Sequence, residues 1–179
     1  SGGDPLILTD THLEKRLNDL ADIKHLRYLR IHSRIPVVLP SRMTTNLYHV
    51  LQATRLKVAL VIHSNCAQEI QTNVVEALKP AKAHGITLLN QSVLLKGVND
   101  SPQALAALSH TLYDAGVMPY YLHKLDKITG SSHFALTAEE EQHIIHVLMR
   151  ILPGFLMPKF VTEIPHAGAK IPAFNTKET

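Results

Sequence analysis

The sequence predicts an α/β protein with parallel strands and outer helices, arranged as an open, partial barrel. Short apolar segments typical of buried strands alternate with longer amphipathic segments typical of helices. This alternation occurs four times after one leading helix and ends on a final strand, and strands separated by helices pair in parallel through right-handed crossovers. Because five strands are too few to close an eight-stranded barrel, we expect the barrel to stay open and to lack its first strands.

The chain is predicted to begin with a helix and a strand. Thr11 and Glu14 have the spacing of a capping box, in which two side chains satisfy backbone donors at a helix start, so we expect a helix over residues 11–23. Residues 28–32 alternate between apolar and polar side chains, as a strand does. Prolines flank residues 37–39, which excludes the middle of a sheet and predicts a loop.

The next segments predict a second helix, a buried strand and a third helix. Thr44 or Thr45 caps the second helix. Residues 57–63 contain a continuous apolar run, which is typical of a strand buried on both faces. Asn65 follows this strand and is expected to cap the third helix, which ends at Gly85.

Three further strands and two helices complete the alternation. Residues 86–89 and 117–122 are predicted strands, and between them Ser101 caps a helix with proline at its first position. Thr137 and Glu140 form a second capping box. The helix that follows has a predicted apolar face, made of Ile144, Val147, Leu148 and Ile151. Phe160 and Val161 form the last predicted strand.

Polar residues follow the carboxyl ends of these strands, where ligands bind in parallel α/β folds. They are His32, Ser33 and Arg34; His63, Ser64 and Asn65; Asn90 and Gln91; Asp126; and the segment from Glu163 to Lys170. The topology therefore predicts that residues far apart in the sequence converge on one site.

Lys170 stands out within this set. It follows Ala167, Gly168 and Ala169, whose small side chains let a flat ligand approach the backbone closely. This setting suits a lysine that carries a cofactor. A solvated charge on a loose tail is the alternative interpretation of the same residues.

Composition limits the classes of function. The 179 residues suffice for one domain with a buried core. The net charge of +3 comes from scattered Lys and Arg, which argues against nucleic-acid binding. Twelve histidines without a paired metal-ligand spacing do not predict a metal site. We expect no membrane association, because no segment has the ~20 apolar residues of a spanning helix and no charged-then-apolar leader opens the sequence.

The chain has one cysteine, Cys66. A single cysteine excludes an internal disulfide framework and any thiolate-held cluster built from this chain alone. We expect Cys66 to be a small buried or helix-start residue, and we expect the protein to be cytoplasmic.

Several segments together resemble the lysine 2,3-aminomutase family. The resemblance covers essentially the whole chain and is most similar to the branch that makes β-lysine for elongation factor P. It is carried by SGGDPL at residues 1–6, RIHSRIPVV at 30–38, GITLLNQSVLLKGVND at 85–100, AGVMPYY at 115–121, Asp126 with GSSHF at 130–134, and the lysine at 170.

Members of this family are radical S-adenosylmethionine enzymes that also use pyridoxal 5′-phosphate. The resemblance implies a radical-SAM TIM-like partial barrel in residues 1–158 and a pyridoxal-lysine segment in residues 159–179. It implies a Schiff base between Lys170 and pyridoxal 5′-phosphate. The turn Ser1-Gly2-Gly3-Asp4 matches the one that meets the amino group of S-adenosylmethionine. Residues placed near the adenosyl group are His63, Asn65, Asn90 and Gln91.

The resemblance also identifies two acidic residues as the substrate site. Asp126 and Glu163 match positions that hold the side-chain ammonium of L-lysine. Two carboxylates around one ammonium suit a sheltered pocket, where an unpaired charge is costly. Taken alone, Asp126 is typical of a turn residue. The family usually has Asp at the second position, so Glu163 reaches one methylene further.

Three other features depart from the family. The loop before the lysine is Pro165-His166-Ala167-Gly168-Ala169 instead of a glycine run, and Cys66 stands where relatives often have His. The family holds a 4Fe-4S cluster with three cysteines, in a CxxxCxxC motif upstream of the Gly-Gly-Asp turn at which this chain starts. We therefore expect the C-terminal portion of a radical aminomutase, inactive by itself. Exposed strand edges at such a boundary predict self-association of identical chains.

The implied reaction is the conversion of L-lysine to β-lysine. Three alternatives remain open: an aminomutase for another amino acid such as glutamate, a Schiff-base aldolase that needs no cysteines, and a non-catalytic binding module. The acidic pair argues against an acidic substrate. A titration with pyridoxal 5′-phosphate separates the aminomutase from the aldolase.

Overall fold

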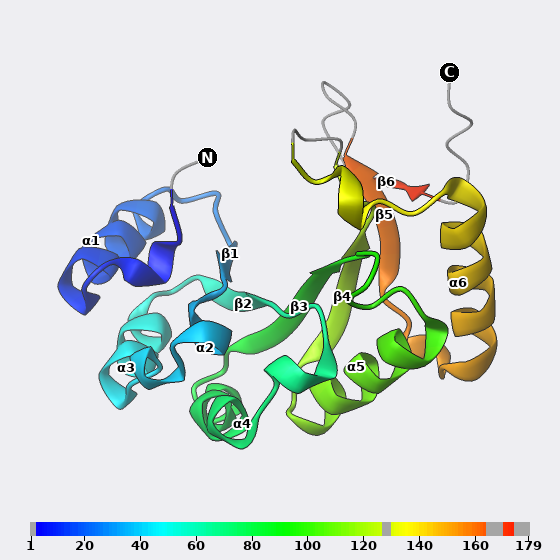
Figure 1. Cartoon of the computed structure of the whole chain (residues 1–179). Helices are drawn as coiled ribbons and strands as arrows, with labels where there is room; N and C mark the ends of the chain where they lie inside the picture. The colour runs from blue at the N-terminus through cyan, green and yellow to red at the C-terminus, as the bar shows by residue number, and fades with distance from the viewer. Residues whose placement is uncertain (1–2, 127–129, 164–169, 174–179) are drawn as a thin grey trace. The chain divides into compact units, whose positions relative to one another are not determined.

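The structure, a computed structural model, describes residues 3–126, 130–163 and 170–173. Its described strands form one sheet in the order β1-β2-β3-β4-β5-β6, which is also their order along the chain (Figure 1). β1 (Tyr28–Ser33) pairs in parallel with β2 (Lys57–His63), and β4 (Met118–His123) pairs in parallel with β5 (Lys159–Glu163). The α/β class and this parallel pairing confirm the prediction from the alternating pattern.

The chain divides into two units. The first comprises residues 1–64, 70–90 and 115–117, and the second comprises residues 65–69, 91–114 and 118–179. In the first unit α1 (Asp10–Ala21) lies beside α3 (Thr45–Ala53), and in the second α5 (Pro102–Asp114) lies beside α6 (Ala138–Ile151) (Figure 1). β3 (Thr87–Val93) has residues in both units.

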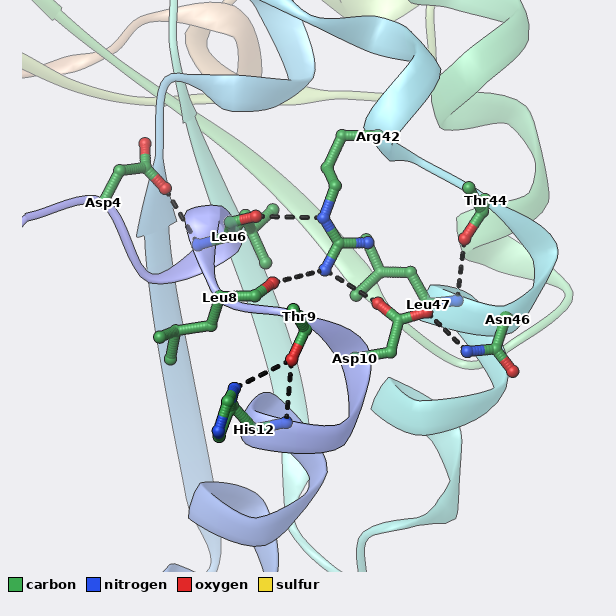
Figure 2. Close-up of polar contacts among 10 residues, drawn as sticks. All are labelled: Asp4, Leu6, Leu8, Thr9, Asp10, His12, Arg42, Thr44, Asn46 and Leu47. Carbon is green, nitrogen blue, oxygen red and sulfur yellow. Dashed lines mark hydrogen bonds and ion pairs between the residues drawn. The ribbon is translucent and has the colours of Figure 1, made fainter.

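Thr9, and not Thr11, caps the first helix, so the predicted capping box is wrong. Thr9 has an extended backbone, and its hydroxyl accepts a hydrogen bond from the His12 amide at 3.4 Å. Asp10 then begins the helix and forms an ion pair with Arg42, at 2.7 Å between Oδ1 and Nη2 (Figure 2). Both threonines suit a cap, and this long-range contact distinguishes them.

Arg42, which lies before α3, forms hydrogen bonds with the N-terminal segment at Leu6 and Leu8. Its Nε donates to the Leu6 carbonyl at 3.0 Å and its Nη2 donates to the Leu8 carbonyl at 2.9 Å (Figure 2). Arg42 ends the 3₁₀ turn Pro40–Arg42, which follows the short helix α2 (Ile35–Val38). The loop predicted at residues 37–39 is therefore mostly helical. Proline fits the first position of a helical turn because no N–H is needed there.

The second helix and the buried strand agree with their predictions. The Thr44 hydroxyl accepts from the Leu47 amide at 3.1 Å and caps α3. β2 covers the predicted residues, and Val58, Leu60, Val61 and Ile62 are buried on its two faces.

Asn65 does not cap the third helix, and that prediction is wrong. α4 (Thr72–Leu78) begins after Gln71, which makes no side-chain capping bond. The Asn65 side chain instead accepts from the Val93 amide at 2.9 Å, so it joins the end of β2 to β3. A short 3₁₀ turn, Ala67–Glu69, separates Asn65 from the helix.

β3 extends to Val93, so Asn90 and Gln91 lie within the strand and not after it. The capping box at the start of α6 is confirmed, because the Thr137 amide donates to Glu140 Oε2 at 2.7 Å and the Glu140 amide donates to Thr137 Oγ at 3.2 Å. The apolar face of α6 agrees with its prediction only at Ile144 and Leu148. Ile145 is fully buried, Val147 is half-buried, and Ile151 is 45% exposed.

The sequence pattern missed a sixth strand. β6 (Lys170–Pro172) pairs antiparallel with β5, and Figure 1 shows it at the end of the sheet. Lys170 is therefore a strand residue, directly opposite Glu163. A three-residue strand that contains proline has no periodicity from which it could be recognised.

Candidate active site

The predicted site residues fall in both units, and each group has its own geometry. Gly3, Asp4, His63 and Asn90 belong to the first unit. Asn65, Gln91, Asp126, Glu163 and Lys170 belong to the second. Ser1, Gly2 and the loop at residues 165–169 lie outside the described residues.

Asp4 fastens the glycine turn to the carboxyl end of β1. Its Oδ1 accepts from the Leu6 amide at 3.0 Å and from the Ser33 hydroxyl at 2.7 Å. Its Oδ2 accepts from the Arg34 amide at 2.7 Å. Three hydrogen bonds to one carboxylate fix the position of Asp4, and its neighbour Gly3 lies at the wall of a pocket.

This pocket has a volume of about 620 Å³ and lies between α1 and β1. Its apolar wall consists of leucines of α1 together with Leu29 and Ile31, and its polar wall includes Gly3, His32 and His63. The His32 and His63 rings meet edge to face, with centroids 6.2 Å apart. The volume and the mixed lining fit a small organic ligand with one polar end.

Asn90 has a structural role within the first unit. It is 2% exposed, its Oδ1 accepts from the Ser64 amide at 2.9 Å, and its Nδ2 donates to the Ser64 carbonyl at 3.1 Å. This reciprocal pair holds the end of β2 against β3. A buried asparagine with both amide groups so engaged is costly to replace.

Asn65 has a comparable role in the second unit. The backbone carbonyl of Asn65 accepts a hydrogen bond from Asn99 Nδ2 at 2.9 Å. Asn99 is fully buried, and its Nδ2 also donates to the Val93 backbone carbonyl. Gln91 is half-buried in β3. Asn65 and Asn99 therefore shape the loop after β2, and a contact of Asn65 or Gln91 with a cofactor stays a prediction.

The amine of Lys170 lies among three side chains of the second unit. Its Nζ forms a hydrogen-bonded ion pair with Glu163 Oε1. The same nitrogen lies 3.3 Å from His123 Nε2 and 5.2 Å from the centre of the Tyr121 ring. The side chain of Lys170 is 25% exposed, so Lys170 is not a solvated tail charge. The amine of Lys170 is therefore held by a carboxylate and lies beside an imidazole and an aromatic ring.

The pKa of Glu163 is lowered by its neighbours. The largest cause is the hydrogen bond from Lys170, followed by the charge of Lys170. Burial opposes this shift, and the charge of His123 adds a smaller lowering. The glutamate thus stays ionised while the lysine ammonium is its partner.

Tyr121 and His123 are site residues that sequence reasoning missed. They lie two residues apart on β4 and so share one face of that strand. Tyr121 also lies against Tyr120, with a hydroxyl-to-hydroxyl distance of 3.0 Å. The period-two spacing of a tyrosine and a histidine at the end of a strand is the signal that could have identified them.

Asp126 is exposed and lies three residues beyond β4. Its backbone carbonyl accepts from the Ser131 hydroxyl at 3.4 Å, which is a turn contact. Its action together with Glu163 stays a prediction.

Within residues 3–126, 130–163 and 170–173, no group of three or more His, Cys, Asp or Glu side chains could hold a metal ion. Cys66 is a half-buried free thiol.

None of the described helices is both long and apolar enough to cross a membrane. The scan against protein-family models finds no match.

Curated relatives named L-lysine 2,3-aminomutase match the chain throughout. Those of Buchnera aphidicola and Escherichia coli are each 45% identical over 96% of this chain, and that of Haemophilus influenzae is 46% identical over 92%. The matched region covers 50%, 50% and 48% of these proteins. The chain therefore spans about half the length of the curated relatives it matches.

Solved structures agree on the fold. Streptococcus suis SuiB, crystallised with S-adenosylmethionine, has a TM-score of 0.59 at 12% identity and is matched over 92% of this chain and 39% of its own. A domain of a pyruvate-formate lyase-activating enzyme from Bacteroides vulgatus also has a TM-score of 0.59 at 12% identity, over 92% of this chain and 96% of its own. These likenesses confirm the predicted fold, a partial barrel of mainly parallel strands with outer helices. The chain is thus similar, over about half of their length, to proteins named L-lysine 2,3-aminomutase, and it shares its fold with these two solved structures.

Proposed function

We propose that the protein containing this chain is an aminomutase, an isomerase that moves the α-amino group of L-lysine to the β-carbon and yields β-lysine. The observation that carries the proposal is the amine of Lys170, held between Glu163 and His123 in a chain 45% identical to enzymes named for this reaction. Because the chain spans half of those relatives, activity and substrate are proposed for the full-length protein.

Lys170 is proposed as the residue that binds pyridoxal 5′-phosphate. When bound, this cofactor supplies an aldehyde for condensation with an amine and a π-system that stabilises a neighbouring radical. The residues present fit it, because the Lys170 amine is partly sheltered and has the ring nitrogen His123 Nε2 at 3.3 Å. When that nitrogen carries no proton, it can take one from the ammonium, since only the neutral amine attacks a carbonyl.

Asp126 and Glu163 are proposed to select the substrate by its distal ammonium. A carboxylate attracts an ammonium and repels an acidic side chain, so lysine is favoured over glutamate. Support comes from the lowered pKa of Glu163, which shows that its environment stabilises the carboxylate beside a cation.

The pocket between α1 and β1 is proposed to receive S-adenosylmethionine. Gly3 and Asp4 form its polar end, and His63 lies on its wall. Asp4 is proposed to position the turn, since its carboxylate already accepts three hydrogen bonds from the chain. The family's 4Fe-4S cluster does not fit this chain, whose one cysteine cannot supply three thiolates, so no step is derived through it.

A cytoplasmic location, a pathway link to elongation factor P and self-association complete the proposal. The first two are supported by the motifs shared with the branch that makes β-lysine for that factor. Self-association is supported by β1, which lies at one edge of the described sheet with Tyr28 70% exposed. Light scattering of the 179-residue chain tests it, and a monomer at micromolar concentration contradicts it.

The reaction is tested by product analysis of the full-length protein with both cofactors and L-lysine. We expect β-lysine from the wild type and none from Lys170→Ala. Lys159→Ala, which changes another lysine at the start of β5, is the control and should keep its activity. Trapping of a carbonyl substrate by borohydride, with no response to pyridoxal 5′-phosphate, would instead indicate an aldolase.

A further inference from the structure

The side chains around Lys170 Nζ have the chemistry of a binding site for a primary ammonium. Glu163 supplies a carboxylate, Tyr121 an aromatic face at 5.2 Å, and His123 a ring nitrogen at 3.3 Å. An ammonium offers three N–H donors and a full positive charge: Glu163 and the ring of Tyr121 attract the charge, and His123 Nε2 accepts an N–H when it carries no proton. At present the chain's own lysine occupies this site.

The backbone positions of the three neighbours are set by the pairing of β4 with β5, which does not involve Lys170. Tyr121 and His123 lie on β4, which pairs in parallel with β5, where Glu163 is the last residue. His123 pairs in register with Val161, and the Leu94 amide donates to the His123 carbonyl at 2.9 Å. The site should therefore persist when the ammonium of Lys170 is removed.

We propose that Glu163, Tyr121 and His123 bind the distal ammonium of the substrate, and that Lys170 occupies their site until it condenses with an aldehyde. This inference rests on the proposed function. It adds Tyr121 and His123 to the residues that select the substrate, and it makes substrate binding conditional on the state of Lys170.

Condensation opens the site for a chemical reason. The ammonium and the aldehyde give a protonated imine and water: two N–H bonds are lost, a C=N bond forms, and the carbonyl oxygen leaves as water. An imine nitrogen would carry one N–H where the ammonium has three, so Lys170 would satisfy Glu163 less well after condensation. A substrate ammonium, with its three N–H donors, would then be the better partner of Glu163.

The first test measures binding of L-lysine to the full-length protein without any aldehyde, by calorimetry. Lys170→Met removes the competing ammonium and Lys170→Arg keeps a cation. We expect Lys170→Met to bind L-lysine at least tenfold more tightly than the wild type or Lys170→Arg. L-norleucine, which lacks the distal ammonium, should bind all three proteins equally. Equal affinity of the three proteins for L-lysine would overturn the inference.

The roles of Tyr121 and His123 beside Glu163 are tested in the Lys170→Met variant. Tyr121→Leu and His123→Leu, each added to Lys170→Met, should reduce the gain in affinity for L-lysine and leave L-norleucine unaffected. A gain that survives both changes would remove Tyr121 and His123 from the site. Circular dichroism checks that the variants are folded.

A second measurement keeps Lys170 in place. Glu163→Gln removes the carboxylate that favours the ammonium form, so imine formation with pyridoxal 5′-phosphate at pH 7, followed by absorbance, should become several-fold faster. An unchanged rate contradicts occupation of the site by Lys170.

Failure of this inference is distinguishable from failure of the proposed function. The wild type loaded with pyridoxal 5′-phosphate could prefer L-lysine to L-norleucine while Lys170→Met gains no affinity for L-lysine. That result would support the proposed function and contradict occupation of the site by Lys170. If the loaded wild type also shows no preference for L-lysine, both proposals are contradicted.

Discussion

Glu163 and Lys170 stand directly opposite each other on the antiparallel strands β5 and β6, and their side chains form an ion pair. The pair links the strand that ends the parallel array to the strand that carries the proposed cofactor lysine. Its formation depends on the ionisation of Glu163, whose pKa is lowered by the hydrogen bond and the charge of Lys170.

The ion pair predicts a small stability difference that depends on pH. Because the folded pKa of Glu163 lies below its ordinary value of 4.5, the stabilisation is present above pH 4.5 and is lost as pH falls through the folded pKa. Glu163 is 57% exposed, so the effect should be below about 1 kcal/mol. Urea unfolding of wild type and Glu163→Gln should differ at pH 7, and the difference should shrink as the pH falls through the folded pKa of Glu163. A difference that does not shrink on acidification would contradict the ion pair, and Glu14→Gln on the exposed face of α1 is the control.

Arg42 is predicted to be a major contributor to stability. It donates to two backbone carbonyls, of Leu6 and Leu8, and pairs with Asp10 (Figure 2). Arg42→Met should lower the free energy of unfolding by about 2–3 kcal/mol, because it removes several charge-assisted bonds at once. Arg42→Lys should recover only part of the loss, since an ammonium lacks the planar fork. Full recovery by lysine would show that charge alone matters.

Several elements could be predicted from sequence because local and buried patterns coincide there. The apolar run of β2 and the capping box at Thr137 specify their structures without long-range information. Thr9 and Thr11 are equivalent as caps until Arg42 meets Asp10. Asn90 suggests a loop by composition, yet it lies in a strand because it satisfies both backbone groups of Ser64.

The site shows the same division. The resemblance to a known family identified Lys170 and Glu163, and the structure brings them together. The family resemblance could not identify Tyr121 and His123, because their role follows from the pairing of β4 with β5 and of β5 with β6. The register of a three-residue strand depends on its partner and not on its own sequence.

Asn90 is predicted to stabilise the fold in the absence of any cofactor. Asn90→Ala leaves the amide and the carbonyl of Ser64 without these partners in a buried place and should lower the free energy of unfolding by about 2–4 kcal/mol. Chemical denaturation of cofactor-free protein measures this. A variant with unchanged stability and weakened S-adenosylmethionine binding would instead assign Asn90 to the cofactor.

The face of α6 is predicted to distinguish two isoleucines. Ile145 is fully buried in the cluster that contains Leu122, Leu148 and Phe160, whereas Ile151 is 45% exposed. Ile145→Ala should cost about 2–5 kcal/mol, and Ile151→Ala well under about 1 kcal/mol. Equal costs for the two changes would show that α6 packs through a different face.

The proposed function depends above all on the position at which pyridoxal 5′-phosphate attaches. The full-length protein is incubated with the cofactor, reduced with borohydride, digested and analysed by peptide mass spectrometry. We predict that the reduced adduct lies on Lys170, and that Lys170→Arg abolishes it while Lys159→Arg does not. An adduct confined to another lysine, or none above the level of a denatured control, would contradict the assignment of Lys170 and with it the aminomutase proposal.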